Sequence, residues 1–161
     1  VYKRQTNDHI RMIIGLMAII FCLDYYFRKD SDKPKKPSKF ASYFWPSLSG
    51  FTSFSIHAGG LPLSFYLLPM RLDRTMYVAT AGLFYLLINL FKIFPYAYLG
   101  EMNFENIYTS LLLLPLAPLG VYFGAYLVDK IGQDWFYKIG YFCTLLAGCK
   151  LFYDGSIKLF L

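Results

Sequence analysis

Long apolar runs separated by short polar islands make up most of this sequence. A helix needs about 20 predominantly apolar residues to cross a bilayer, with a range of about 17–25. Runs of roughly this length cover residues 12–27, 76–98, 108–128 and 136–153. Charged residues lie mainly between the runs, as they do in multi-span helical membrane proteins. The pattern therefore predicts an all-α, polytopic membrane protein with about four transmembrane helices.

The apolar stretch of residues 41–70 does not fit a single crossing. One straight helix over this stretch would be roughly 45 Å long, against about 30 Å of hydrocarbon. Its middle contains the helix breakers Gly59, Gly60 and Pro62, beside His57. Helix-breaking backbone at membrane depth is tolerated only where protein or water satisfies the freed polar groups. We expect a broken re-entrant helical hairpin here, and the break is a candidate binding site.

Residues 28–40 form the clearest internal boundary, because they are rich in lysine and interrupted by two prolines. Such a segment predicts an exposed, extended linker. A re-entrant hairpin puts most basic residues on one side of the membrane, whereas a single crossing divides them evenly. Lys and Arg accumulate in cytoplasmic loops, so the hairpin topology is favoured and the basic linker is expected to be cytoplasmic.

Composition adds three exclusions to this picture. With 57% hydrophobic and 16% charged residues, the chain is not intrinsically disordered. The net charge of +6 comes from islands of Lys and Arg instead of one stripe, so no nucleic-acid partner is expected. Three cysteines match no metal-ligand spacing, and no metal site is expected. We expect a multi-pass protein of the plasma membrane, with the lipid bilayer as its surroundings.

The hairpin topology also predicts a domain organisation. The helix within residues 1–27 then runs in the opposite direction to the last helix of the chain. One unit of hairpin and three spans (residues 41–161), preceded by the tail of an inverted copy, is the plan of many secondary transporters. Residues 1–27 would be the last helix of an N-terminal repeat. Because the sequence begins at Val1, we interpret it as a fragment whose partner is the missing part of that repeat.

The stretch SGFTSFSIHAGGLP at residues 49–62 closely resembles the sulfite exporter TauE/SafE family of membrane transporters. Similar segments follow in the family's order: Thr-Ala at 80–81, Asn-x-x-Lys at 89–92, and Leu-Pro-x-Ala-x-x-Gly-x-x-x-Gly at 114–124. The resemblance implies a multi-span transporter of small anions, with sulfite and organosulfonates as substrates of the named members. One departure is Leu61, because the family often follows Gly-Gly directly with proline.

A broken helix offers an anion free backbone N–H groups and the positive end of a helix dipole. We therefore expect Gly59 and Gly60 to expose N–H groups, and the helix that begins near Pro62 to direct its N-terminus at the substrate. His57 could donate to the anion or carry a proton. The alternatives are an ordinary tight turn for the glycines and a packing role for His57.

Four further side chains are weaker candidates. Thr52 and Ser53 offer hydroxyl groups near the break, although hydroxyls in membrane helices often bond back to their own helix. The resemblance implies that Lys92 attracts the substrate with Asn89 as a neutral hydrogen-bonding neighbour. Lys92 could instead extend to the lipid headgroups. In the segment 120–124, the two glycines are expected to serve helix packing.

The sequence thus predicts a secondary transporter that exports a small sulfur-containing anion by alternating access, with no catalytic residues and no cofactor. Coupling to a proton through His57 and assembly into a homo-oligomer are left open. The alternatives are a transporter of another small anion or a metal complex, an integral membrane enzyme with His57 as base, and a scaffold subunit. The enzyme has the least support, because the sequence contains neither His-Glu-x-x-His nor Gly-x-Ser-x-Gly.

Overall fold

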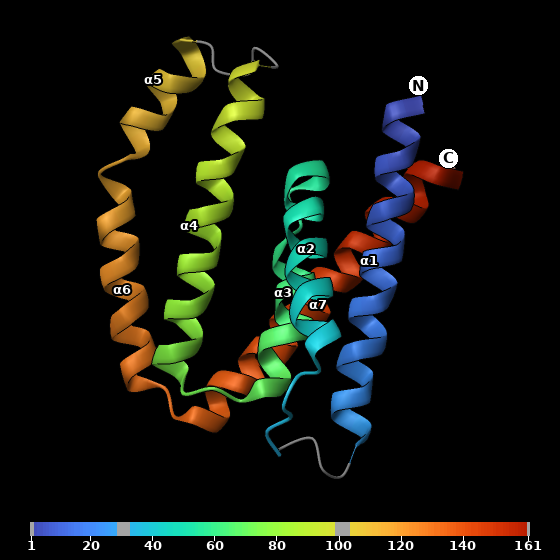
Figure 1. The fold of residues 1–161 in the computed structure, drawn as a ribbon, viewed down its shortest axis with the longest axis vertical. Helices are drawn as coiled ribbons and strands as arrows, with labels where there is room; N and C mark the ends of the chain where they lie inside the picture. Colours follow the sequence, from blue (N-terminus) through green and yellow to red (C-terminus); the bar gives the residue numbers. More distant parts are fainter. Residues whose placement is uncertain (1, 29–32, 99–103, 161) are drawn as a thin grey trace. The chain divides into compact units, whose positions relative to one another are not determined.

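A computed structural model describes residues 2–28, 33–98 and 104–160 of the chain, with side chains for residues 8–28, 33–98 and 108–157. The described residues form helices and no strand (Figure 1), which confirms the predicted all-α class. In chain order the elements are α1 (Tyr2–Phe27), α2 (Lys39–Ile56), α3 (Gly60–Leu67), the 3-10 helix η1 (Leu68–Met70), α4 (Arg74–Tyr98), α5 (Phe104–Leu113), α6 (Leu116–Lys130) and α7 (Gln133–Phe160).

The chain divides into two compact units. The first contains Val1–Leu72 and Tyr137–Leu161, and the second contains Asp73–Phe136. Helices α1, α2 and α3 therefore share one unit with most of α7, whereas α4, α5 and α6 form the other. This division does not follow the boundary expected at residues 28–40. The assignment of residues 1–27 to a separate repeat stays a prediction.

In the first unit, α1 and α7 run antiparallel and touch backbone to backbone. A Cβ atom added at Gly15 would lie 2.5 Å from the Phe152 nitrogen and 2.8 Å from the Gly148 oxygen. One added at Gly155 would lie 2.7 Å from the Met12 nitrogen. Small residues in membrane helices permit this close approach. The contact between α1 and α7 therefore depends on glycine on both helices.

The helices α2 and α3 pack on α1 through an aromatic and aliphatic core. Phe65 of α3 lies at its centre, 4.9 Å from the Phe21 ring and 5.3 Å from the Trp45 ring, measured between centroids. Ile14, Ala18 and Leu61 complete the buried cluster. In water, burial of such side chains is the largest favourable contribution to folding. Between helices in a bilayer, van der Waals contacts from close packing supply the favourable free energy instead. This core fixes α2 and α3 on α1.

In the second unit, the structure differs from the single helix expected over residues 108–128. The helix is interrupted by a turn at Leu114 and Pro115, so that α5 ends and α6 begins within the expected span. Proline has no N–H and clashes with the carbonyl four residues earlier. Tight turn bonds replace the helical ones, from the Leu114 nitrogen to the Leu111 oxygen and from Ala117 to Leu114.

The described residues include two helices that are long and apolar enough to cross a membrane, Asp8–Phe27 and Arg74–Tyr98. They match the expected spans at 12–27 and 76–98. Helices α5 and α6 have 10 and 15 residues because of the break at Pro115. Helix α7 has 28 residues and carries charged side chains along its length, Lys150 among them. The expected count of about four spans stays a prediction.

Candidate functional site

The break expected at the middle of residues 41–70 is present, and α2 ends there in a left-handed cap. His57 has φ 55° and ψ 28°, and its backbone N–H donates to the Thr52 carbonyl. The Ala58 N–H donates to the same carbonyl, with 3.2 Å between nitrogen and oxygen. A positive φ is uncommon for residues other than glycine. The cap reverses the chain before Gly59.

Gly59 lies directly against α2, and this contact closes the turn. The Ser49 hydroxyl donates to the Gly59 carbonyl at 2.6 Å, and both residues are buried. A Cβ atom on Gly59 would lie 2.6 Å from the Ser53 Cβ and 2.7 Å from the Ser49 carbonyl oxygen. Real Cβ atoms do not approach other atoms so closely, so no larger residue fits at position 59 without movement of α2.

Helix α3 begins immediately after this contact. Gly59 is its N-cap, and Gly60 is its first residue. Pro62 falls in the first turn, where a missing N–H is tolerated because that group has no partner within the helix. The nitrogens of Leu61 and Leu63 donate to the Ala58 and Gly59 carbonyls at 3.4 Å and 3.3 Å. The position expected for a second half-helix near Pro62 is thereby confirmed.

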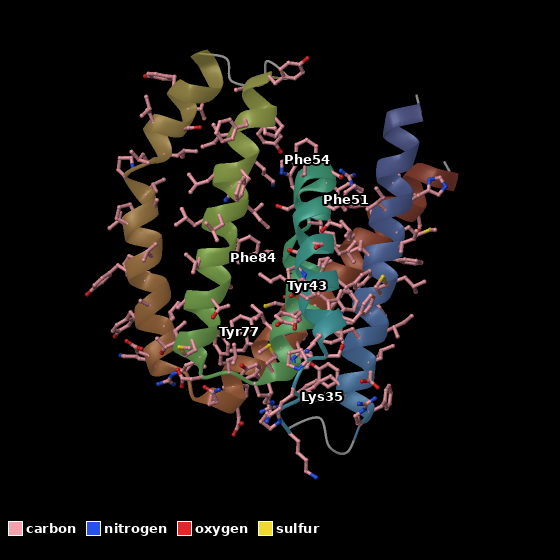
Figure 2. All side chains as sticks on the ribbon, viewed as in Figure 1. Lys35, Tyr43, Phe51, Phe54, Tyr77 and Phe84 are labelled. Carbon is pink, nitrogen blue, oxygen red and sulfur yellow. The ribbon has the colours of Figure 1, made fainter. Side chains whose placement is uncertain are left out.

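The two ends of the segment 35–70 also meet, so α2, α3 and η1 form a helical hairpin (Figure 1). The Lys35 N–H donates to the Pro69 carbonyl at 2.8 Å, and the Tyr66 hydroxyl donates to the Ser42 hydroxyl at 3.2 Å. We call this end the hairpin base and residues 57–60 the hairpin tip. Figure 2 shows Phe51 and Phe54 near the tip end of α2 and Lys35 at the base. Re-entry of this hairpin into a membrane stays a prediction.

The structure places six of the predicted site residues in this hairpin, in two environments. His57 and Gly60 are exposed at the tip. Thr52, Ser53, Gly59 and Pro62 are buried inside the hairpin. The Thr52 hydroxyl donates to its own helix, to the Leu48 and Ser49 carbonyls at 2.8 Å and 3.2 Å. The tip thus presents a histidine and a helix N-terminus, and the buried residues hold it in place.

The remaining predicted residues, Asn89 and Lys92, lie one turn apart on α4. They belong to the second unit, and the hairpin belongs to the first. Asn89 is exposed and Lys92 is half-buried on a helix whose other exposed residues are mostly apolar. In membrane proteins, ionisable side chains within a transmembrane helix often line the path of an ion or substrate. The pair Asn89 and Lys92 is a candidate for this role.

Ser49 is the residue that the sequence reasoning missed as part of the site. It is fully buried and makes the hydrogen bond that closes the turn. The signal was the spacing of two small residues, Ser49 and Ser53, four positions apart on one face of α2. Gly59 packs closely against that face.

Replacement of Ser49 by alanine is expected to weaken the hairpin. The change removes the donor to the Gly59 carbonyl, which is buried and would then lack this bond. Loss of one partner of a buried hydrogen bond costs about 1–3 kcal/mol. Thermal unfolding of the purified protein measures the effect, with Ser47→Ala on the exposed face of α2 as the control. Equal melting temperatures for the two variants would contradict the closing role of Ser49.

Within the part of the chain that has described side chains, no three His, Cys, Asp or Glu residues gather as metal ligands. The groups that the hairpin tip offers are instead backbone N–H donors and one imidazole. The site is therefore suited to a small anion, which such donors bind without a buried cation.

Comparison with known proteins gives one positive result. A family model described as "Sulfite exporter TauE/SafE" matches residues 2–151, which include α1, the helical hairpin and the Asn89 and Lys92 pair. No curated protein and no solved structure matches the chain.

Proposed function

This chain belongs to the sulfite exporter TauE/SafE family of membrane transporters, and we propose that it exports a small sulfur-containing anion, sulfite or an organosulfonate, by alternating access. The observation that carries the proposal is the hairpin tip, where a histidine and the N-terminus of α3 are exposed together. Membership in a transporter family also favours transport over an enzymatic role for His57.

Anion recognition is assigned to the tip because it combines donors with positive potential. At the start of α3 the Leu61 N–H is bonded to the Ala58 carbonyl and Pro62 has no N–H, so the donor assigned to the anion is the Gly60 N–H, and the helix dipole makes this end positive. Gly60 carries no side chain at the first position of α3, so an oxyanion can reach the backbone there. His57 supplies a further donor, and a second when it is protonated.

The buried residues of the hairpin act by holding this end of α3 in place. Gly59 and Ser49 bring the start of α3 against α2, and Thr52 accepts the cap bonds through its carbonyl. Preorganised donors bind an anion more strongly than mobile ones, because ordering costs little when the ligand arrives. Thr52, Ser53, Gly59 and Pro62 are therefore positioning residues in this proposal, and His57 and Gly60 touch the substrate.

The pair Asn89 and Lys92 is assigned a role in attracting the anion along its path. Lys92 is a cation on an apolar helix, and Asn89 adds a neutral donor one turn away. Neutralisation of Lys92 by glutamine would lower the rate of export at low substrate concentration, where electrostatic attraction has most influence. Unchanged rates would leave Lys92 as a residue that extends to the headgroups.

The experiment that tests the site is replacement of His57 by glycine. Glycine adopts the left-handed conformation at no steric cost, so the turn is retained and only the imidazole is lost. One hydrogen bond to a charged ligand contributes about 1.5–3 kcal/mol, so export of sulfite at low concentration should fall about tenfold or more. Sulfite efflux from cells that make equal amounts of each protein in the membrane measures this effect.

His9→Asn serves as the control, because His9 is exposed on α1 and lies outside the hairpin. We expect wild-type efflux from it. Efflux that His57→Gly leaves unchanged would remove His57 from the substrate site. If the wild-type protein exports another anion but no sulfite, the assignment of the site stands and the proposed substrate is wrong.

A further inference from the structure

A pocket at the base of the hairpin is distinct from the tip. It is a small hollow that is partly open to solvent. Its walls come from the end of α1, the basic linker, the hairpin base and α7: Phe21, Asp24, Tyr25, Arg28, Lys33, Lys35, Pro69 and Tyr141. All of these residues belong to the first unit. We call this site the basic pocket.

Among the described residues, positive charge exceeds negative charge around the basic pocket. Arg28, Lys33 and Lys35 line it together with the described carboxylate of Asp24. Asp24 pairs with Arg28 at 3.0 Å, with both side chains about half exposed. Arg71 lies behind the tyrosine wall, where its guanidinium donates to the Tyr25 hydroxyl at 3.3 Å. The pocket therefore favours an anionic group.

The walls of the pocket are held by specific contacts. The Tyr25 and Tyr141 rings stack at 3.6 Å between centroids, which joins α1 to α7. The Lys35 N–H donates to the Pro69 carbonyl at 2.8 Å, which joins the linker to the hairpin base. Arg71 also lies over the Tyr137 ring, 5.1 Å from its centroid. An anion in this pocket would therefore connect α1, the linker, the hairpin and α7.

The pocket lies where a candidate membrane span ends. The candidate span Asp8–Phe27 stops one residue before Arg28, so the pocket is at the level expected for lipid headgroups. Leu23, Tyr26 and Phe27, next to the pocket residues on α1, are exposed apolar side chains. They offer a surface for acyl chains beside a cationic site. Basic pockets between membrane helices bind anionic headgroups in this way.

We propose that the basic pocket binds a phosphate group, supplied by the headgroup of an anionic phospholipid. Arg28 and Lys35 contact the phosphate, and the acyl chains lie along the exposed apolar side chains of α1. The bound lipid stabilises the hairpin base against α1 and α7. This site depends on the membrane location of the protein and not on the identity of its cargo.

Thermal unfolding of the full-length protein in detergent tests the proposal, with added phosphatidylglycerol, phosphatidylcholine or inorganic phosphate. At about 100 times its dissociation constant, phosphatidylglycerol should raise the melting temperature by about 5–10 °C. Phosphatidylcholine should have little effect, because it carries no net charge. A shift from inorganic phosphate as large as that from phosphatidylglycerol would overturn the assignment to a lipid.

The double variant Arg28→Gln, Lys35→Gln should lose at least half of the phosphatidylglycerol shift. Both side chains are exposed, and the Lys35 backbone bond to Pro69 is retained, so the variant is expected to fold. Lys36→Gln, Lys39→Gln removes the same charge outside the pocket, from the linker and from the first residue of α2, and it should keep the full shift. Equal shifts in the two double variants would show general attraction to basic residues and overturn the proposed site. The amount of phosphatidylglycerol that remains bound in native mass spectrometry gives a second readout, which does not depend on variant stability.

Discussion

Gly59→Ala is expected to abolish anion export and to destabilise the first unit by about 3 kcal/mol or more. The added methyl group would lie 2.6 Å from the Ser53 Cβ and 2.7 Å from the Ser49 carbonyl oxygen. Overpacking of a close contact costs about 1–3 kcal/mol and sometimes more. Here one of the two neighbours is backbone, which cannot rotate away. The hairpin must therefore open, and the N-terminus of α3 must leave its position.

Gly60→Ala is the matched control for this substitution. Gly60 is exposed at the first position of α3, so alanine there is expected to be tolerated. Its melting temperature should equal or exceed that of the wild type. Thermal unfolding in detergent compares the two variants directly. If Gly59→Ala proved as stable as Gly60→Ala, the close contact between Gly59 and α2 would be refuted.

Gly15→Ala is expected to have the second large effect, by separating α1 from α7. Its methyl group would lie 2.5 Å from the Phe152 nitrogen and 2.8 Å from the Gly148 oxygen. Both neighbours are backbone atoms of α7, so the helices must move apart along the contact. Such overpacking should lower the free energy of unfolding by about 3 kcal/mol or more. The fraction of protein that stays monodisperse after heating measures it.

Gly124→Ala provides the comparison on another helix. In the part of the chain with described side chains, no atom lies within 4 Å of a Cβ added at Gly124 or Gly120. The expected packing role of these two glycines therefore finds no contact among the described residues. Alanine should raise stability by about 1 kcal/mol through helix propensity. If Gly124→Ala lowered the stability as much as Gly15→Ala, α6 would have a packing partner at Gly124, and the two glycines would not differ in role.

Local sequence signals predicted the breaks and ends of several helices. Gly59, Gly60 and Pro62 placed the hairpin tip correctly, because glycine and proline act on the backbone where they stand. An exposed linker was expected at residues 28–40, and α1 ends at Phe27 while α2 begins at Lys39. The role of this segment as a domain boundary stays a prediction. These features need no knowledge of distant contacts.

The break at Pro115 could not be predicted as firmly. Proline within an apolar run either kinks a membrane helix or ends it, depending on whether neighbours satisfy the freed groups. Pro46 and Pro95 lie inside continuous helices of this same chain. The apolar pattern alone therefore does not distinguish the three prolines.

The arrangement of the site required long-range contacts that no local pattern contains. Thr52 and Ser53 were interpreted as substrate candidates from residue type alone, and the structure shows them buried within the hairpin. Ser49 was not among the candidate site residues, whereas its bond to Gly59 closes the turn. Likewise, the meeting of Gly15 with Gly148 joins positions at opposite ends of the sequence. Pairings of this kind depend on how the helices fold together.

The central claim is that the hairpin tip binds the exported sulfur anion. Sulfite efflux from cells that make the full-length protein tests it most directly, with wild type compared with Gly60→Leu at equal amounts in the membrane. Gly60 is exposed at the first position of α3, so we expect leucine to cover this N-terminus, and thermal unfolding beside the wild type checks that the hairpin is retained. Gly120→Leu, on α6 with no neighbour within 4 Å among the described residues, is the control. We predict export by the wild type and the control and loss of export in Gly60→Leu, whereas wild-type export by Gly60→Leu would contradict the assignment of the tip as the substrate site.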